Sequence, residues 1–287
     1  MKSLAVPKLV PGHNATTVSM IEKKMFIVPA GYDPKKYGMF LRVERSSTHD
    51  GTGFRTVIFL KGCPLRCVWC STPESQSTGI ERGEGEAYGK LMSVEDLMAE
   101  VRKDSIFYFH SGGGMTLSGG EPLMQADFAE QLLKQAQSEG INTAVETSMS
   151  VPWKNLEQVL PFVDHIYADI KHIDADLHKK YTGIDNIEIL DNVRRLDNRC
   201  DRIRFVVRIP LIPGINNDPD TLHGIGRFCA NLRNMDCVQL LPYHRLGMDT
   251  YRKLGRVYPL EDLKPPSKEH MEDCCEIIRS HVGSACM

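Results

Sequence analysis

The sequence has no long apolar run and no run of basic residues. Its 35 Lys and Arg are balanced by 37 Asp and Glu, which gives a formal net charge of -2 at pH 7. A chain that tracks a phosphate backbone needs a basic stretch, so we expect no nucleic acid partner. The opening residues are broken by Pro7 and Pro11 and are too short for a signal sequence or a membrane-spanning helix. These absences predict a cytoplasmic protein without membrane contact.

Sustained periodicity is missing from residues 1–37. They contain several Pro and Gly and no helical or strand repeat. We interpret them as an N-terminal extension that forms no independent domain. The remaining residues, 38–287, suffice for one large domain with a buried core, since 41% of the chain is hydrophobic.

From Gly38 onward, apolar runs of strand length alternate with helical patterns. This alternation predicts an α/β fold with βα units around a parallel sheet. Apolar residues recur at i, i+3, i+4 and i+7 in residues 94–101, behind a capping signal of Ser93 and Asp96, and again in residues 129–136. The six expected strands are Thr56–Lys61, Met115–Ser118, Asn142–Thr147, His165–Ile170, Ile203–Ile209 and Cys237–Leu241.

Paired cysteine motifs of the structural zinc type are also absent. Of nine cysteines, three lie within one short segment and six are spread over residues 200–286. A reducing cytosol disfavours disulfides, so each is expected in a metal site, in catalysis or in the core. Four share an apolar helix face or lie in an expected strand, which predicts core positions: Cys229, Cys237, Cys274 and Cys275. The other two, Cys200 and Cys286, have no partner at ligand spacing.

The segment KGCPLRCVWC places Cys63, Cys67 and Cys70 directly after an expected strand, in a C-x3-C-x2-C spacing. Thiolates suit iron–sulfur clusters or zinc, and such short spacers let one loop surround a single cluster. Three ligands leave one iron of a four-iron cluster open, and the amino and carboxylate groups of S-adenosylmethionine can chelate it. The spacing therefore predicts one [4Fe-4S] cluster with S-adenosylmethionine. Structural zinc, which needs four ligands, is the weaker alternative because no second C-x2-C or H-x3-H pair occurs.

Polar and charged residues follow the ends of the other expected strands. In a parallel α/β barrel the carboxyl ends of the strands form one mouth, where the chemistry gathers. Each residue alone is more often a solvated loop residue, and only the joint placement favours a functional site. The residues are Gly119, Gly120, Glu121, Glu146, Thr147, Asp169, Lys171, Arg208 and His244.

With these residues, the chain resembles the glycyl radical enzyme activating enzymes of the radical S-adenosylmethionine superfamily. The similar motifs cover about residues 38–280 and occur in one order, which is more specific than any single motif. They are STHDG, KGCPLRCVWC, SGGGMTLSGGEP, AVETS, YADIKHID, RIPLIPGINND, LLPYHRLG and YPLEDLKPPSKE.

The resemblance implies a partial (β/α)6 barrel, TIM-like with parallel strands, and an anaerobic reductive reaction. An electron enters the cluster, the sulfonium is cleaved, and a 5′-deoxyadenosyl radical removes hydrogen from a backbone glycine of a partner. The partner would be a glycyl radical enzyme, such as a formate-lyase, a dehydratase or another lyase. A flavodoxin- or ferredoxin-like protein would donate the electron, and the chain would act as a monomer.

The same resemblance implies roles for single residues. Lys171 would join the three cysteines in the catalytic set. A monovalent cation would lie beside Glu146, Thr147 and Asp169. The glycine-bearing peptide would face His49, Asp50 and Arg55. The cofactor-binding residues would be Trp69, Gly119, Gly120, Glu121, Glu146, Thr147, Asp169, Lys171, Arg208 and His244.

The chain departs from the family pattern in three places. Thr52 replaces the Pro of HDGPG, which loosens a turn beside the expected peptide groove. Met149 replaces the Gly of TSG, so a close backbone approach there is in doubt. Residues 71–92 contain no cysteine, whereas many relatives carry a ferredoxin-like insert with two more clusters after the first motif.

Two other functions compete with glycine activation. A radical enzyme acting on a small molecule or a modified base would share the cysteine loop but enclose its substrate. A zinc-stabilised binding module would have no enzymatic activity. The HDG segment and the SGGEP motif favour activation of a protein partner.

Overall fold

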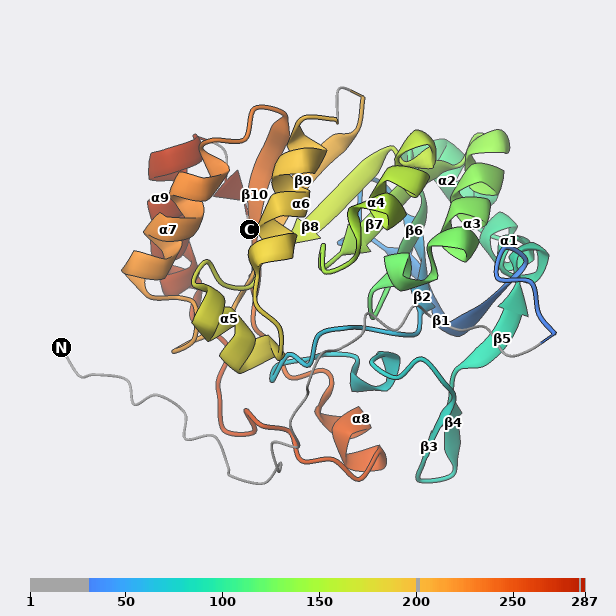
Figure 1. Cartoon of the computed structure of the whole chain (residues 1–287), viewed down its shortest axis with the longest axis horizontal. Helices are drawn as coiled ribbons and strands as arrows, with labels where there is room; N and C mark the ends of the chain where they lie inside the picture. The colour runs from blue at the N-terminus through green and yellow to red at the C-terminus, as the bar shows by residue number, and fades with distance from the viewer. Residues whose placement is uncertain (1–30, 200–201, 284, 287) are drawn as a thin grey trace.

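A nine-stranded sheet forms the centre of the protein in the computed structural model, which describes residues 31–199, 202–283 and 285–286 (Figure 1). The strand order is β11-β10-β9-β8-β7-β6-β2-β1-β5. Six neighbouring strands are parallel and match the six expected strands to within two residues at either end. They are β2 (Arg55–Leu60), β6 (Gly114–Gly119), β7 (Asn142–Thr147), β8 (His165–Asp169), β9 (Arg204–Leu211) and β10 (Met235–Pro242). The sheet is open at β11 and β5, which confirms a partial barrel.

Some strands have no counterpart among the expected ones. The long β1 (Tyr37–Ser47) pairs antiparallel with β2, and β5 (Lys90–Ser93) pairs antiparallel with β1. Burial along β1 falls from Met39 and Phe40 to an exposed end, so its sequence lacks the alternation that marks a half-buried strand. The remaining ones are β11 (Ala285–Cys286) beside β10 and the hairpin of β3 (Glu81–Gly83) and β4 (Glu86–Tyr88), which projects next to α8 (Figure 1).

The helices that contribute most to the main core cover one face of the sheet (Figure 1). They are α1 (Val94–Arg102), α3 (Ala126–Ser138), α4 (Trp153–Val159), α6 (Ile187–Asp197), α7 (Pro219–Cys229) and α9 (Lys268–Val282). The other helices in the described ranges are α2 (Ser105–Ser111), α5 (Ala175–Thr182) and α8 (Met248–Lys253), with 3-10 turns η1 (Pro73–Ser75), η2 (Pro122–Gln125) and η3 (Leu160–Phe162). Within the described ranges, no helix has the length and apolar character needed to cross a membrane.

The expected cap of α1 is present. Ser93 Oγ accepts a hydrogen bond of 3.1 Å from the backbone N–H of Asp96, which satisfies one free donor of the first turn. Three cysteines on α7 and α9 are buried, as expected for core residues: Cys229, Cys274 and Cys275. Cys237 lies in β10 as expected but is only half-buried, and Cys286 lies in β11. Cys200 is outside the described residues.

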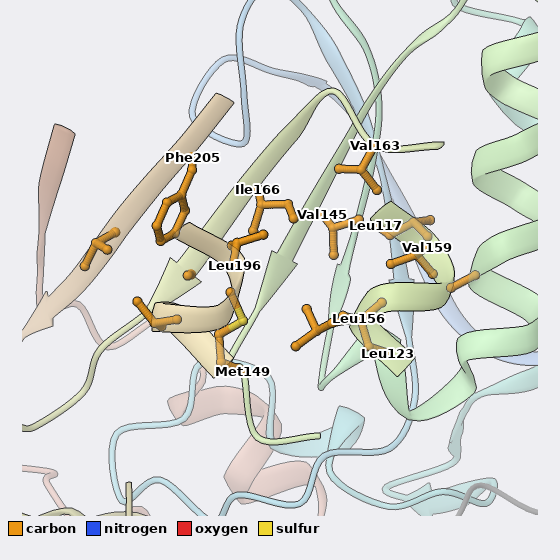
Figure 2. Close-up of a cluster of buried hydrophobic side chains, with 14 of the residues drawn as sticks. Leu117, Leu123, Val145, Met149, Leu156, Val159, Val163, Ile166, Leu196 and Phe205 are labelled. Carbon is orange, nitrogen blue, oxygen red and sulfur yellow. The ribbon is translucent and has the colours of Figure 1, made fainter. Parts of the chain in front are cut away.

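The main core fills the space between the sheet and its helices. Figure 2 shows Val145, Ile166 and Phe205 of neighbouring strands packed against Leu156 of α4 and Leu196 of α6. Successive side chains of a strand point to opposite faces of the sheet. The apolar residues point to the helices, and the residues that alternate with them point to the inner face of the barrel. That inner face carries polar side chains: Thr116, Ser118, Glu146, Asp169, Arg208 and Gln239.

Candidate active site

The cysteine loop follows the carboxyl end of β2 and is fixed on two sides. The N–H of Gly62 donates to Ser75 O at 2.7 Å, which connects the start of the loop to η1 after its last cysteine. On the other side, Arg66 N–H donates to Thr182 O at 2.7 Å at the end of α5. The β10–α8 connection also packs here, since a Cβ on Gly247 would lie 2.8 Å from Cys70 O. These contacts fix the position of the loop against α5 and the β10–α8 connection.

Trp69 packs below the loop in a second apolar cluster, separate from the main core. It is 8% exposed and is surrounded by Tyr181, Tyr243, Tyr251 and Tyr258. The hydroxyls of Tyr243 and Tyr258 lie 2.9 Å apart and satisfy each other. In this position the indole anchors the loop, and its expected contact with a cofactor stays a prediction.

The three thiols are free and close enough to influence one another. Burial raises the pKa of Cys63 above its ordinary range, and Cys67 and Cys70 raise it further. Burial also raises the pKa of Cys67 to about 12, against the opposing effect of Lys171. In the described ranges, no three His, Cys, Asp or Glu side chains converge on the position of a single metal ion.

Three half-buried thiols in one loop fit a multi-iron cluster. Each thiolate ligand of such a cluster binds a different iron, so the sulfur atoms need not converge on one ion. Because burial keeps the free thiols protonated, iron must displace their protons to bind, which is ordinary for thiolate ligands. The donor set is therefore compatible with the expected cluster.

The two glycines after β6 bring this turn into direct contact with the cysteine loop. A Cβ on Gly119 would lie 2.3 Å from Leu60 O, and one on Gly120 would lie 2.4 Å from Gly62 O. Gly120 N–H donates to Leu60 O at 3.0 Å, and Glu121 N–H donates to Gly62 O at 2.7 Å. The absence of side chains thus serves first to seat the cysteine loop on the end of β6.

Glu121 is fully buried and its carboxylate is bound by the chain itself. It accepts hydrogen bonds from the N–H groups of Leu123 and Ser148 at 3.1 and 2.7 Å. The hydroxyl of Ser148 donates at 2.6 Å, and that of Thr147 lies 2.9 Å from one oxygen. Burial raises the pKa of Glu121, which these donors oppose. The carboxylate therefore joins the ends of β6 and β7, a connection that the sequence did not reveal.

Met149 keeps the backbone conformation that glycine favours. Its φ is 59°, in the left-handed region. Its side chain is fully buried in the main core (Figure 2), and its N–H donates to Thr147 Oγ1 at 3.0 Å. Met149 therefore combines a left-handed backbone with a side chain packed in the core.

Lys171 and Asp169 form a partly buried ion pair at the carboxyl end of β8. The ammonium nitrogen lies 2.5 Å from Asp169 Oδ2. Burial lowers the pKa of Lys171, but Asp169 and the thiols of Cys67 and Cys63 raise it more, so that the net shift is upward. Lys171 is thus a cation next to the cysteine loop, and its expected catalytic role stays a prediction.

Arg208 connects four parts of the inner face. Its guanidinium donates to the carboxylate of Glu146, to Gln239 Oε1 at 2.9 Å and to the carbonyl of His49 at 2.6 Å. The same group stacks on Tyr167 at 3.9 Å from the ring centroid. Arg208 therefore holds the loop that contains His49 against the barrel interior, in addition to lying among the expected cofactor residues.

Glu146 and Asp50 meet on the inner face. Burial raises the pKa of Glu146 to about 7, with Arg208 opposing the shift and Asp50 adding to it. Ser118 Oγ donates to Glu146 at 2.7 Å, and Thr116 Oγ1 donates to Asp50 O at 2.8 Å. The structure thus brings the expected peptide-facing Asp50 next to an expected cofactor residue.

Arg55 lies in a different environment from Asp50. It is fully buried at the start of β2, where it donates to Thr116 Oγ1 at 3.0 Å and to Asn142 Oδ1 at 2.6 Å. Burial lowers its pKa to about 10. Its donors are used inside the barrel, and its expected contact with the peptide stays a prediction. The Arg55 side chain packs against Gly51, since a Cβ on Gly51 would lie 3.0 Å from Arg55 Nε.

Two further residues complete this region. His244 is exposed just after β10. Lys61, which sequence reasoning missed, is fully buried beside the cysteine loop and donates to Glu74 O. Nothing in the sequence signals this burial, because Lys at a strand end is ordinarily solvated. A separate hollow of about 610 Å³ lies outside the barrel near Lys35 and Gln135 and contains none of the expected residues.

Comparison with known proteins identifies the relatives of this arrangement. Residues 57–223 match the Radical SAM superfamily. The chain is 37% identical over 282 aligned positions to the (2S)-3-sulfopropanediol dehydratase activating enzyme of Klebsiella oxytoca, covering 79% of this chain and 88% of that protein. It is 35% identical over 242 positions to the pyruvate formate-lyase-activating enzyme of Staphylococcus epidermidis, covering 82% and 93%.

Solved structures agree with the fold. A domain of the pyruvate-formate lyase-activating enzyme from Bacteroides vulgatus superposes with a TM-score of 0.51 at 29% identity, covering 61% of this chain and 98% of that one. A radical SAM methyltransferase from Sphaerobacter thermophilus gives a TM-score of 0.58 at 16% identity, covering 86% and 76%. The second likeness concerns the fold alone.

Proposed function

The chain belongs to the radical SAM superfamily and, within it, to the glycyl radical enzyme activating enzymes, and we propose that its partner is a dehydratase, a decarboxylase or a carbon–sulfur or carbon–carbon lyase. These are the classes of enzyme that the relatives are named for activating. The [4Fe-4S] cluster and S-adenosylmethionine are the cofactors of this superfamily. When bound, they supply reductive cleavage of the sulfonium and a radical that removes hydrogen from a backbone glycine of the partner.

One observation supports the proposal: the inner face lies between the thiol loop and the HDG loop, to which the family resemblance assigns the peptide. Cys63, Cys67 and Cys70 would hold the cluster at the carboxyl end of β2, with Lys171 as the neighbouring cation. Across the same face, Arg208 ties the HDG loop to the barrel through His49 O. A flexible peptide admitted past this loop would reach the cofactors while remaining attached to a larger protein.

The remaining residues around the cofactors are assigned by position. Gly119 and Gly120 would present backbone to the methionyl amino end, and Asp169 would lie near the ribose or carboxylate. His244 would approach the nucleotide from the exposed end of β10. Glu121 would act by fixing the turn, because its own oxygens are occupied by Leu123, Thr147 and Ser148.

Electron paramagnetic resonance under anaerobic conditions tests the function. The reconstituted chain, dithionite and S-adenosylmethionine are mixed separately with sulfopropanediol dehydratase, indoleacetate decarboxylase and pyruvate formate-lyase. We expect a glycine-centred doublet on at least one of them. Cys67→Ala should abolish both the doublet and cofactor cleavage, whereas Cys229→Ala, a core residue remote from the loop, should retain both. Cofactor cleavage by the wild type without any doublet would instead favour the small-molecule alternative.

We also propose a single cluster per chain. Residues 71–92 contain no cysteine. The alignment to the Klebsiella relative has 282 positions but covers only 79% of this chain, so the relative has residues that this chain lacks. Iron and sulfide analysis should give about four irons per reconstituted chain. A value of about twelve would contradict this, and zinc in place of iron would support a structural zinc module.

A monovalent cation beside Glu146, Thr147 and Asp169 remains part of the proposal. The two carboxylates lie on adjacent strands of the inner face, but Glu146 already pairs with Arg208 and Asp169 with Lys171. A cation would therefore bind these two carboxylates weakly when no further negative group is present. It would bind more tightly when the carboxylate of the cofactor is added. Equal cofactor affinity in potassium chloride and in tetramethylammonium chloride would argue against this site.

We propose that the chain is a cytoplasmic monomer and receives its electron from a flavodoxin- or ferredoxin-like protein. Without cysteines for further clusters in residues 71–92, the electron would pass directly to the single cluster. Sedimentation of the reconstituted chain tests the monomer. Cofactor cleavage driven by reduced flavodoxin in place of dithionite tests the donor.

A further inference from the structure

Large apolar side chains gather on the surface of α2. Ile106, Phe107 and Phe109 are 59%, 50% and 84% exposed. Phe54, which is 43% exposed at the end of the β1–β2 loop, packs edge-on against Phe107 with 6.3 Å between ring centroids. We call these four residues the α2 patch. The other large apolar side chains exposed in the described ranges come from separate segments: Tyr32, Ile80, Leu177, Ile187, Leu246 and Val257.

The α2 patch is held in place by a single buried anchor. Tyr108 is the buried residue of α2, and its hydroxyl lies within hydrogen-bonding distance of Thr56 Oγ1 and of Val101 O. A helix of this kind displays its remaining apolar side chains to solvent. Apolar side chains exposed to water lose the stabilisation that burial gives, so a cluster of them is typical of a surface that a partner covers. Aromatic side chains are also enriched in protein interfaces.

The patch adjoins the loop expected to receive the glycine-bearing peptide. Phe54 N–H donates to Ser111 Oγ at 2.9 Å, and Gly114 N–H donates to Phe54 O at 3.1 Å. Gly53 packs so closely that a Cβ on it would lie 2.5 Å from Gly113 N. The loop that contains Asp50 is therefore joined directly to α2, with Asp50 on the inner face and the α2 patch outside.

The patch lies at the opposite edge of the sheet from the cysteine loop. Phe54 immediately precedes β2 and α2 leads into β6, so both lie at the amino ends of parallel strands. Figure 1 shows α2 at the top of the view, whereas α5 and α8, which flank the cysteine loop, lie at the bottom. A partner on the α2 patch would leave the cysteine-loop edge free for an electron donor.

We propose that the α2 patch is the contact surface for the folded body of the partner glycyl radical enzyme, through an apolar surface next to its glycine loop. This inference rests on the proposed function. A peptide that passes Asp50 brings the protein from which it extends against the outer side of the same loop, where Phe54 begins the patch. The glycine loop would then be recognised by the inner face, and the partner as a whole by the α2 patch.

Radical formation on intact partner and on peptide separates these two contacts. The assay uses the partner on which the wild-type chain forms a radical, and a short synthetic peptide with that partner's glycine-loop sequence. For the double variant Phe107→Ser, Phe109→Ser, we expect the half-saturating concentration of intact partner to rise about tenfold or more, with the peptide value unchanged. The matched control is Ile187→Ser, which removes a 68% exposed apolar side chain from α6 and should change neither value.

Each of the other outcomes contradicts the docking surface, alone or together with the proposed function. A radical with the wild type and an unchanged half-saturating concentration in the double variant would overturn the docking surface alone. Absence of a radical with the wild type on any partner would overturn the proposed function and the docking surface together. Wild-type dimers in sedimentation that the double variant dissociates would show that a second copy covers the patch, and would also overturn the proposal.

Discussion

At the scale of the residue, the structure separates the conformation of a position from the identity of its side chain. Met149 adopts a φ of 59° where the family has glycine, and compensates by burying its side chain completely. A left-handed non-glycine residue costs about 1–2 kcal/mol, and a buried Met returns more than that. The sequence could show the replacement but could not show that the turn survives it.

Two substitutions at this position should reverse the usual order of Ala and Gly. Met149→Ala loses the buried side chain and keeps the backbone strain, whereas Met149→Gly loses the side chain and removes the strain. We expect both to be destabilised by about 2–5 kcal/mol, with the Gly variant more stable than the Ala variant by about 1 kcal/mol. Anaerobic urea unfolding measures both. An Ala variant that is the more stable of the two would show that the turn relaxes away from positive φ.

Arg208 offers a second test at this scale, because its observed contacts differ from its expected role. Arg208→Lys keeps a cation beside Glu146 but cannot reach Gln239 and His49 O together. If the residue positions the HDG loop, the concentration of glycine-loop peptide needed for half-maximal radical formation should rise about tenfold, with cofactor affinity little changed. A fall in cofactor affinity with unchanged peptide dependence would assign Arg208 to the cofactor instead.

At the scale of the element, capping and glycine placement explain where the helices begin and how the loops fit. The Ser93 cap of α1 was evident from sequence because it depends on residues three positions apart. The seat of the cysteine loop on Gly119 and Gly120 was not, because it joins strands β2 and β6 that are far apart in the chain. Local signals predict element ends, and only long-range packing reveals the contacts between them.

Removing the cap should weaken α1 measurably. Ser93→Ala deletes the acceptor for the N–H of Asp96 and should lower the free energy of unfolding by about 1 kcal/mol. The matched control is Ser138→Ala at the last residue of α3, where the hydroxyl only donates back to Gln135 O. That control should change stability by less than about 0.5 kcal/mol. Equal effects of the two substitutions would remove the cap as the cause.

At the scale of the whole molecule, buried imidazoles make stability depend on pH. Burial lowers the pKa of His165, His172 and His178. The Nε2 atoms of His172 and His178 are buried with no hydrogen-bond partner among the described residues. The unfolded chain binds protons as the pH falls below about 6.5, but the folded chain does not, so stability falls as the pH falls through this range.

The number of protons that the imidazoles bind on unfolding sets the upper limit of this pH dependence. Each such imidazole contributes at most about 1.4 kcal/mol per pH unit. Unfolding of the reconstituted chain at pH 7.5, 6.5 and 5.5 should show the decline, and His178→Gln should reduce its slope whatever it does to overall stability. Parallel pH dependences for wild type and variant would exclude His178 as a contributor.

By itself, the sequence determined what depends on neighbours along the chain. Periodicity located the six parallel strands, the C-x3-C-x2-C spacing indicated the cluster loop, and several motifs in one order identified the family. Tertiary structure alone decided which polar side chains are available to a ligand, because burial and partners from distant strands set this. It closed the oxygens of Glu121 with Ser148 and Thr147, placed Arg55 inside the barrel and joined the aromatic surface of α2 to the loop of Asp50. The residue type determines how many hydrogen bonds a side chain can form, but only the folded chain determines which partners it has.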